Sequence, residues 1–466
     1  MSRFRLHCVA RGVALALSLS GCTTMIPNYE RPAAPVAAAY PGATPVPEPA
    51  GAAASDIEWQ SFFGDERLKR LIDVALNNNR DLRVAVLNIE QARAQYQVRR
   101  ADELPTVGIG AAGSRQPTGG GSIVSVYSAG LIVTAYELDF FGRVRSLSAA
   151  ALAQYLSTEE ARKNVQIALI SSVANTYLNL LADDEVLAVT RETLITREES
   201  LKLTKLKFDV GAASELDYRQ AESLFEGARA VLALQTRQRA VDENALVLLL
   251  GQSLPAGLPP ASSIASQTLI KELPAGLPSE VLTRRPDVLQ AEQQLISANA
   301  NIGAARAAFF PRITLTGSAG SASSELSGLF KSGSGAWSFM PQLLLPLFDA
   351  GRNQANLDVA EVSREIALAQ YEKAIQTAFR EVSDALAGQA TLGEQVRAQE
   401  AQTNAEAVRF KLADLRYRNG AASYLDVLDA QRSLFVTQLA LVQARTQLVQ
   451  NQVNLYKALG GGWKTP

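Results

Sequence analysis

Cys22 is the residue of this chain whose type and position predict a definite chemistry. Three arginines precede an apolar run at 13–19, and that run leads into the letters LSGC at 19–22. Small residues before a cysteine, directly after a short apolar core, are typical of a bacterial lipoprotein signal, in which the cysteine becomes the acylated first residue. Thr23 rather than Asp follows, which in such signals implies export to the outer membrane. The alternative is an ordinary secretion signal with a chance cysteine.

Removal of the signal at 1–21 leaves few side chains that could catalyse a reaction. It removes His7, the only histidine, together with Cys8, so that Cys22 is the one cysteine left. Disulfides, histidine-dependent triads and His/Cys metal sites are thereby excluded from the mature chain. Three of the 45 basic residues also go, and the remaining 42 against 46 acidic residues give a net charge of −4. This charge excludes the basic field that nucleic acid requires.

Carboxylates remain, but no pair stands apart from ordinary helix-surface charge. We therefore expect no enzyme, no metal site and no cofactor beyond the lipid on Cys22.

A ten-residue stretch occurs twice, and the rest of the chain is organised around it. Residues 208–217 read FDVGAASELD and residues 417–426 read YRNGAASYLD, at an offset of 209. Each copy lies between long helix-forming segments. The glycine of each copy is predicted to end one helix in the left-handed conformation, and the serine to cap the next. The two predicted hairpin tips, where we expect function to lie, contain Gly211, Ala212, Ala213, Ser214, Gly420, Ala421, Ala422 and Ser423.

The duplication extends over most of the chain. The same offset of 209 recurs between Gly142 and Gly351, whereas Pro105 and Pro311 pair at an offset of 206. The period is too long for a solenoid, so it indicates a duplicated half-domain. We expect a signal at 1–21, a lipidated Pro/Ala-rich tether at 22–55, a first repeat at 56–251, a connection at 252–280, a second repeat at 281–460 and a tail at 461–466.

Long helices are predicted on both sides of each tip. The segment 143–208 forms a helix of some 65 residues, which is roughly 100 Å long at 1.5 Å per residue. The return helices at 214–250 and 423–459 are shorter, and helices at 59–76 and 81–101 add to their length.

The final helix carries apolar stripes on two flanks. One follows heptad positions from Leu425 to Tyr456, and the other runs from Leu434 to Leu455. Helices of this kind pack between two neighbours, as staves in a cylinder do. The inner helix of a plain bundle is the alternative.

Between Pro105 and Gly142, and again between Pro311 and Gly351, the spacing of hydrophobic residues changes from a helical period to alternation. Near 105–140 and again near 311–348, segments of about ten residues alternate apolar with small or polar side chains, as membrane β-barrels require. In the second pair, Ile313 and Leu315 alternate with Thr314. Four strands cannot close a barrel whose smallest natural form has about eight, so several chains must pool their strands. Soluble β-hairpins are the alternative.

The chain resembles the TolC/OprM-type outer-membrane efflux channels. The resemblance covers nearly all of the mature sequence, and the ending VNLYKALGGGW is similar to that of the lipoprotein multidrug-efflux members. The other matching motifs are WxxF from Trp59, FPRITLTGSAG from Phe310, LFDAGR from Leu347 and RYRNGAASYLDVLDAQRSLF from Arg416.

The resemblance implies a mainly α-helical fold with membrane β-structure. Four strands from each chain of a homotrimer would close a twelve-stranded outer-membrane barrel, continued by a long periplasmic α-helical barrel. It also implies a periplasmic adaptor protein, which the small tip residues would contact, and a proton-driven inner-membrane efflux pump. The expected function is passive export of small molecules. Protein secretion of type I and a lipid-anchored coiled-coil scaffold without a pore are the alternatives.

The resemblance also places a periplasmic gate just after the second tip. Asp429 and Arg432 match its acidic and basic positions, Leu425 an apolar constriction, and Tyr417 a residue that ties the closed state. Arg432 falls in an otherwise apolar heptad seam, where a charge is costly without a partner or water. Three copies of Asp429 around a narrow axis would form a carboxylate ring that favours cations. A local surface pair between Asp429 and Arg432 is the alternative.

Asp217 and Asp426 occupy the first turn after each tip. They are either helix-start acids that favour the helix dipole or contacts with a neighbouring helix. The charged gate positions occur only in the second copy, because Asp429 corresponds to Gln220 and Arg432 to Ser223. We therefore expect opening to move the second hairpin more than the first.

Overall fold

The computed structural model of the chain describes residues 24–41, 54–118, 120–267 and 284–464. The expected signal peptide and Cys22 lie outside the described residues. Parts of the predicted tether, connection and tail lie outside them as well.

The described residues form two compact units, and each unit draws on both halves of the duplication. The units therefore do not follow the boundary between the predicted repeats. The strand unit comprises the segments ending at Ala34, Leu87–Glu160 and Leu289–Ala374, and the tip unit comprises Pro35–Val86, Ala161–Val288 and the chain from Ile375 onwards.

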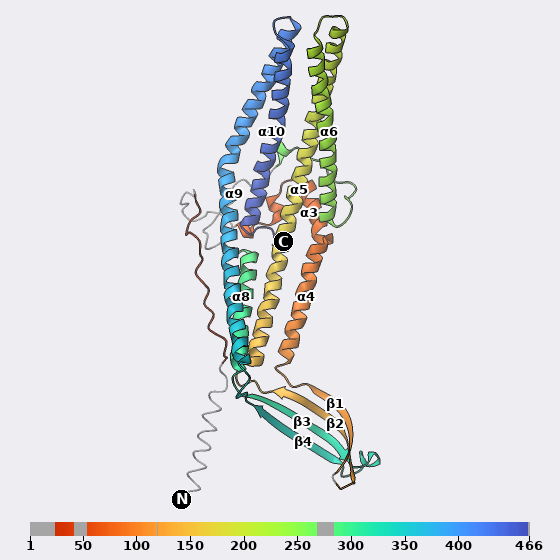
Figure 1. Cartoon of the computed structure of the whole chain (residues 1–466), viewed down its shortest axis with the longest axis vertical. Coiled ribbons are helices and arrows are strands. Elements are labelled where there is room, and N and C mark those ends of the chain that lie inside the picture. Colours follow the sequence, from red (N-terminus) through yellow and green to blue (C-terminus); the bar gives the residue numbers. More distant parts are fainter. Residues whose placement is uncertain (1–23, 42–53, 119, 268–283, 465–466) are drawn as a thin grey trace. The chain divides into compact units, whose positions relative to one another are not determined.

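The strand unit contains one antiparallel sheet in the order β1-β2-β3-β4 (Figure 1). Its strands are β1 (Val107–Pro117), β2 (Ile123–Glu137), β3 (Arg312–Ser323) and β4 (Gly335–Leu344). The two predicted strand pairs are confirmed, and β2 joins β3, so that the first half of the chain pairs with the second. The outer edges of β1 and β4 have no partner strand within the described residues.

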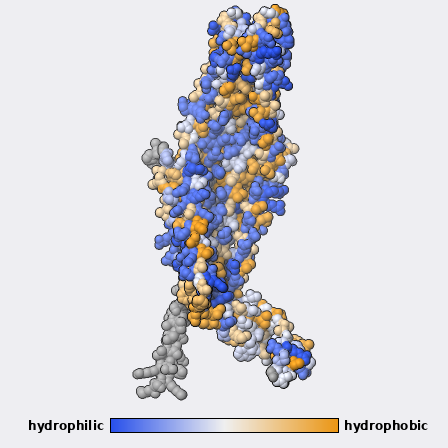
Figure 2. All heavy atoms as spheres, viewed as in Figure 1, coloured by the Kyte–Doolittle hydropathy of each residue, from blue (hydrophilic) through white to orange (hydrophobic). Residues whose placement is uncertain are grey.

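One face of the sheet is apolar and open to its surroundings. Ile109, Leu131, Ala319 and Trp337 stand opposite one another across the four strands. Directly paired residues point to the same face. Ile109 is 87% exposed and Trp337 80% exposed, so no described part of the chain covers the face. Pale and orange residues predominate over the strands in Figure 2, and strongly hydrophilic residues gather at the loop end of the sheet.

The opposite face of the second strand pair carries polar side chains. Thr314 pairs with Gln342, and Ser318 with Ser338, whose hydroxyl oxygens lie 2.7 Å apart. The predicted alternation of apolar and polar positions is therefore confirmed in β3.

Two long helical hairpins follow the strand pairs. α5 (Arg143–Asp209) returns through α6 (Glu215–Leu250), and α9 (Arg352–Arg418) returns through α10 (Tyr424–Ala458). α5 and α9 both have 67 residues, as a duplicated half-domain predicts. Among the described helices, α5 alone is long and apolar enough to cross a membrane, but 61% of its apolar window is buried, as in the core helix of a soluble protein.

The segment predicted as one helix over 59–76 is two helices. α2 (Trp59–Phe62) ends before Asp65, and α3 (Glu66–Asn78) begins after it. The Asp65 carboxylate accepts hydrogen bonds from two backbone N–H groups of the first turn of α3, at 2.8 and 3.1 Å. This cap starts a new helix, and the break brings the aromatic residues of α2 into the main apolar core of the tip unit.

A further helix precedes each strand pair, α4 (Arg80–Ala101) in the first half and α8 (Pro286–Ala307) in the second. The short 3-10 helices are η1 (Ala54–Asp56), η2 (Ile264–Ser266) and η3 (Leu326–Gly328).

Residues 24–41 of the predicted tether contain neither helix nor strand, and its last two residues, Ala54 and Ser55, lie in η1. The stretch 24–41 is not a free linker, because Tyr29 and Arg31 both donate hydrogen bonds to Glu292 of α8. This stretch of the tether is therefore bound to α8.

Candidate functional site: the helical tips and the gate positions

Both hairpin tips have the predicted backbone conformation. Gly211 has φ +77° and Gly420 has φ +73°, in the left-handed region that favours glycine. In each tip the next backbone N–H donates to a carbonyl of the last helical turn, at 2.7 Å in the first tip and 2.8 Å in the second. Ala213 and Ala422 are half-buried, and the other tip residues are exposed. Each tip therefore presents small side chains on a rigid turn.

Asp217 and Asp426 complete capping boxes at the starts of α6 and α10. The hydroxyl oxygens of Ser214 and Ser423 accept from the backbone N–H groups of these aspartates, and each carboxylate accepts from the serine N–H at 3.2 Å. Two otherwise unpaired donors are satisfied at each helix start. The capping boxes agree with the interpretation as helix-start acids, and a contact with a neighbouring helix stays a prediction.

Tyr417 links the two hairpins of one chain. Its hydroxyl accepts a hydrogen bond from Lys207 Nζ at 2.9 Å, and the same ammonium lies 4.4 Å from the centre of its ring. The Tyr417 ring also packs against Tyr424, with ring centres 5.2 Å apart. Lys207 was missed by sequence reasoning. Its only signal is its place beside Phe208, the counterpart of Tyr417 in the first copy.

Asp429 forms an ion pair with Arg409 of α9, which also contacts Glu406 at 3.1 Å. The Asp429 side chain is 53% exposed. Within the described residues Arg432 has no carboxylate at ion-pair distance, so the local Asp429–Arg432 pair considered from the sequence is not formed. Asp429, the acidic gate position, is therefore paired with a residue of α9, the other helix of its own hairpin.

Leu425, Asp429 and Arg432 form an exposed stripe on α10. Their spacing places them on one face, and all three are exposed. Leu428 and Phe435 belong to a different face, which is buried.

The expectation that Leu425 and Arg432 lie in the packed seam is therefore wrong. An α-helix drifts by about 20° per heptad from a 3.5-residue repeat. The heptad position that is buried at Val453 and Thr446 consequently faces outward near the tip.

Arg197 of α5 is a buried cation close to this region that sequence reasoning did not identify. It is 6% exposed, donates to the Leu224 carbonyl at 3.0 Å and lies 5.1 Å from the centre of the Phe435 ring. Burial, and secondarily the charge of Arg432, lower the pKa of its guanidinium. The second hairpin therefore packs against a cation contributed by the first.

A family model described as outer membrane efflux protein matches residues 71–252 and 277–461. The chain belongs to the outer membrane efflux protein family. The solvent efflux pump outer membrane protein SrpC of Pseudomonas putida is 50% identical over 457 residues, which cover 96% of this chain and 97% of that protein. The outer membrane protein OprJ of Pseudomonas aeruginosa is 48% identical, with 96% and 95% covered.

Solved structures share the fold of this outer membrane efflux protein. The open state of the Neisseria gonorrhoeae MtrE outer membrane channel aligns with a TM-score of 0.86 at 43% identity, over 95% of this chain and 99% of that one. A membrane protein from Pseudomonas aeruginosa aligns with a TM-score of 0.88 at 47% identity, over 95% and 98%.

Family membership establishes the general function. The protein is the outer-membrane channel component of an efflux system, extends into the periplasm and works with partner proteins. It is a passive conduit and not an enzyme. The interpretation as a scaffold without a pore is thereby excluded.

Proposed function

We propose that three copies of this efflux protein assemble into one channel, in which four strands from each chain close a twelve-stranded barrel. The observation that carries this proposal is the open sheet, whose exposed apolar row runs from Ile109 to Trp337. Unpaired strand edges cannot face lipid, and four strands are too few to close on themselves. Identical sheets joined around a threefold axis remove every edge.

The same assembly is anchored through acylation of Cys22, which would become the first residue of the mature chain. The barrel and the acyl chains then attach each subunit to the outer membrane at two points.

The gate of the channel lies on the exposed stripe of α10. Three copies of Asp429 around the axis form a carboxylate ring that admits cations, with Leu425 as the apolar constriction. Their exposure in the single chain supports this proposal, because residues that line a lumen cannot be buried within their own subunit. The bond between Lys207 and Tyr417 holds the two tips of one chain together in the closed state.

A periplasmic adaptor binds the exposed tips, and an inner-membrane pump driven by protons supplies the cargo. The cargo is small and apolar. The names of its relatives support this class, since they include a solvent efflux pump, a toluene efflux pump and an antibiotic efflux pump.

Planar-bilayer conductance of the purified mature protein tests the pore and its gate together. The comparison is between the wild type and the Asp429→Ala, Arg432→Ala double variant. Small cation-selective steps that grow in the double variant support both. A Glu394→Ala, Arg397→Ala variant is the matched control, because it removes an exposed ion pair with the same three-residue spacing from α9 of the same hairpin.

Two outcomes would separate the parts of the proposal. Equal conductance in the wild type and the gate variant would retain the channel and discard the gate assignment. Sedimentation that gives a monomer, together with an absence of conductance, would overturn the trimeric barrel.

A further inference from the structure

The N-terminal strap, defined as residues 24–31, lies along one face of α8. Three residues of that helix contact it, namely Glu292, Asn299 and Gly303. Intervals of seven and four residues place them on the same face. The strap runs antiparallel to α8, since its last residues meet Glu292 and its first meet Gly303.

Glu292 is a buried carboxylate whose partners come from the strap. Its side chain is 7% exposed. It accepts hydrogen bonds from Arg31 Nε at 2.7 Å, from Arg31 Nη2 at 2.8 Å and from the Tyr29 hydroxyl at 3.0 Å. A bidentate, charge-assisted contact of this kind is among the stronger polar interactions. Without the strap, Glu292 would lose these partners at a buried position, which is costly.

The other two contacts fit the strap closely. Asn299 is 3% exposed, and its Nδ2 donates to the Pro27 carbonyl at 2.8 Å. A Cβ added to Gly303 would lie 2.6 Å from Ile26 Cγ1 and 2.8 Å from the Ile26 backbone nitrogen. Only glycine leaves room for the strap at this position. The face of α8 therefore has both the polar groups and the shape of a docking site for residues 26–31.

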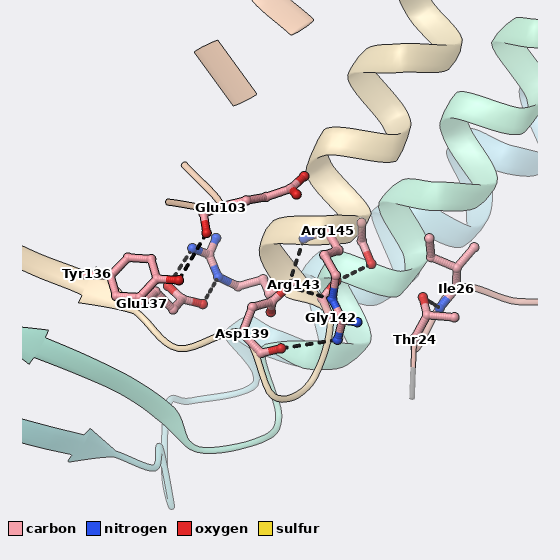
Figure 3. Close-up of polar contacts among 10 residues, drawn as sticks. Thr24, Ile26, Glu103, Tyr136, Glu137, Asp139, Gly142, Arg143 and Arg145 are labelled. Atoms are coloured by element: carbon pink, nitrogen blue, oxygen red, sulfur yellow. Dashed lines mark hydrogen bonds and ion pairs between the residues drawn. The ribbon is translucent and has the colours of Figure 1, made fainter. Parts of the chain in front are cut away.

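The first residues of the strap lie where β2 gives way to α5. A Cβ added to Gly303 would also lie 2.6 Å from Ser146 Oγ, which belongs to the first turn of α5. Figure 3 shows Thr24 and Ile26 beside the start of that helix. The same junction is fastened by Arg143, which donates two hydrogen bonds of 2.7 Å to Glu137 at the end of β2.

We propose that the α8 face formed by Glu292, Asn299 and Gly303 is a docking site for the strap, and that docking holds the acylated N-terminus at the strand-to-helix junction. The inference rests on the proposed acylation of Cys22. Cys22 precedes Thr24 by only two residues in the sequence, and one residue spans at most about 3.6 Å. The acyl chains and the end of the sheet thus enter the same leaflet side by side.

An undocked tether would position the lipid far less well. A flexible chain of about 30 residues has a root-mean-square span of roughly 30 Å, and a Pro-rich one is longer. Docking therefore raises the effective concentration of the sheet at the membrane surface to which the lipid is already attached. The expected consequence is faster insertion of the strands, with no change in the final channel.

Arg31→Glu is the variant that releases the strap most selectively, because it opposes Glu292 without altering any helix. Docking is detected by photo-cross-linking from p-benzoylphenylalanine introduced at position 24. In the otherwise unchanged protein this side chain should cross-link to α5 and α8. Arg31→Glu should lose this cross-link, and the double variant Arg31→Glu, Glu292→Arg should regain it. Arg306→Glu, which opposes Glu361 at an exposed α8–α9 pair, is the matched control.

The role of the strap in insertion is measured by the rate at which the heat-modifiable, folded β form appears in the outer membrane. We expect Arg31→Glu to slow this step several-fold, the charge-swapped pair to restore it, and Arg306→Glu to leave it unchanged. In a Cys22→Ser background Arg31→Glu should have no further effect, because the strap acts through the lipid.

Three results would overturn the proposal. Equal slowing by Arg31→Glu in both backgrounds would make the strap an ordinary packing element. Loss of the cross-link without slower insertion would remove its role in positioning. Mass spectrometry that finds Cys22 unacylated would refute the proposed anchor and with it this role, whereas the cross-link would still report docking.

Discussion

Gly130 of β2 and Gly320 of β3 stand directly opposite each other where the first half of the chain pairs with the second. A Cβ on Gly130 would lie 2.4 Å from the Ala319 carbonyl oxygen, and one on Gly320 would lie 2.2 Å from the Ala129 carbonyl oxygen. Both contacts are with backbone, which cannot move aside as a flexible side chain can. The two half-sheets are therefore joined by a pair of positions that tolerate no side chain.

Gly130→Ala should prevent the sheet from folding normally. The added methyl group forces β2 and β3 apart, and the heat-modifiable form of the outer-membrane protein should be lost or strongly reduced. Gly335→Ala is the matched control, since a Cβ there meets nothing within 4 Å. Normal amounts of folded protein from Gly130→Ala would show that β2 and β3 do not approach as described.

Tyr417→Phe and Tyr417→Ala should loosen the tips to different degrees. Phenylalanine loses the hydrogen bond from Lys207 but keeps a ring beneath the ammonium, whereas alanine loses both contacts. Single-channel conductance should therefore rise in the order wild type, Tyr417→Phe, Tyr417→Ala. Lys207→Ala should resemble Tyr417→Ala. An equal rise of the conductance in Tyr417→Phe and Tyr417→Ala would mean that the Tyr417 hydroxyl alone accounts for the link between the two tips.

Arg409→Ala should change ion selectivity and leave stability alone. Arg409 is paired with Asp429 at the surface, where ion pairs contribute little to folding. Its loss leaves the carboxylate without its neutralising partner, so cation selectivity should increase, whereas Asp429→Ala should decrease it. Reversal potentials in a salt gradient measure the effect, and Arg397→Ala is the control. Identical reversal potentials in Arg409→Ala and the wild type would place Asp429 outside the ion path.

Features encoded by local chemistry could be predicted from the sequence. Gly211 and Gly420 end their helices because a left-handed residue is required there, and the serines that follow supply the caps within three residues. The strand pairs were also predictable, because an alternating pattern distinguishes Ile313 from Thr314 without reference to any other segment. Each of these signals lies within a few residues of its consequence.

Features that depend on how helices rotate against each other were not predictable. Heptad spacing assigns Arg432 to the packed seam, but accumulated drift turns it outward, and Asp429 meets Arg409, which lies 20 residues earlier on another helix. The contact between Arg31 and Glu292 joins residues 261 positions apart. The break between α2 and α3 did have a local signal, since Asp65 is a good N-cap residue, and it was outweighed by the helical spacing of the leucines.

Asp183 is a 9% exposed residue of α5 in the tip unit. Burial and a hydrogen bond with Asp242 raise the pKa of Asp183 from 3.8 to about 7, against the lowering effect of Arg239. A carboxyl whose pKa is higher in the folded state binds its proton more tightly there. Its favourable contribution is therefore complete below about pH 4 and is lost as the pH rises through 7.

Asp183→Asn imitates the protonated group at every pH. The variant should melt at a higher temperature than the wild type at pH 8, and the difference should shrink towards zero at pH 4 because both side chains are then neutral. Thermal unfolding followed by circular dichroism measures it, with the exposed Asp384→Asn as the control for a change of charge alone. A difference in melting temperature that is the same at pH 4 and pH 8 would mean that Asp183 is ionised in the folded protein throughout this range, with Arg239 outweighing Asp242 and burial.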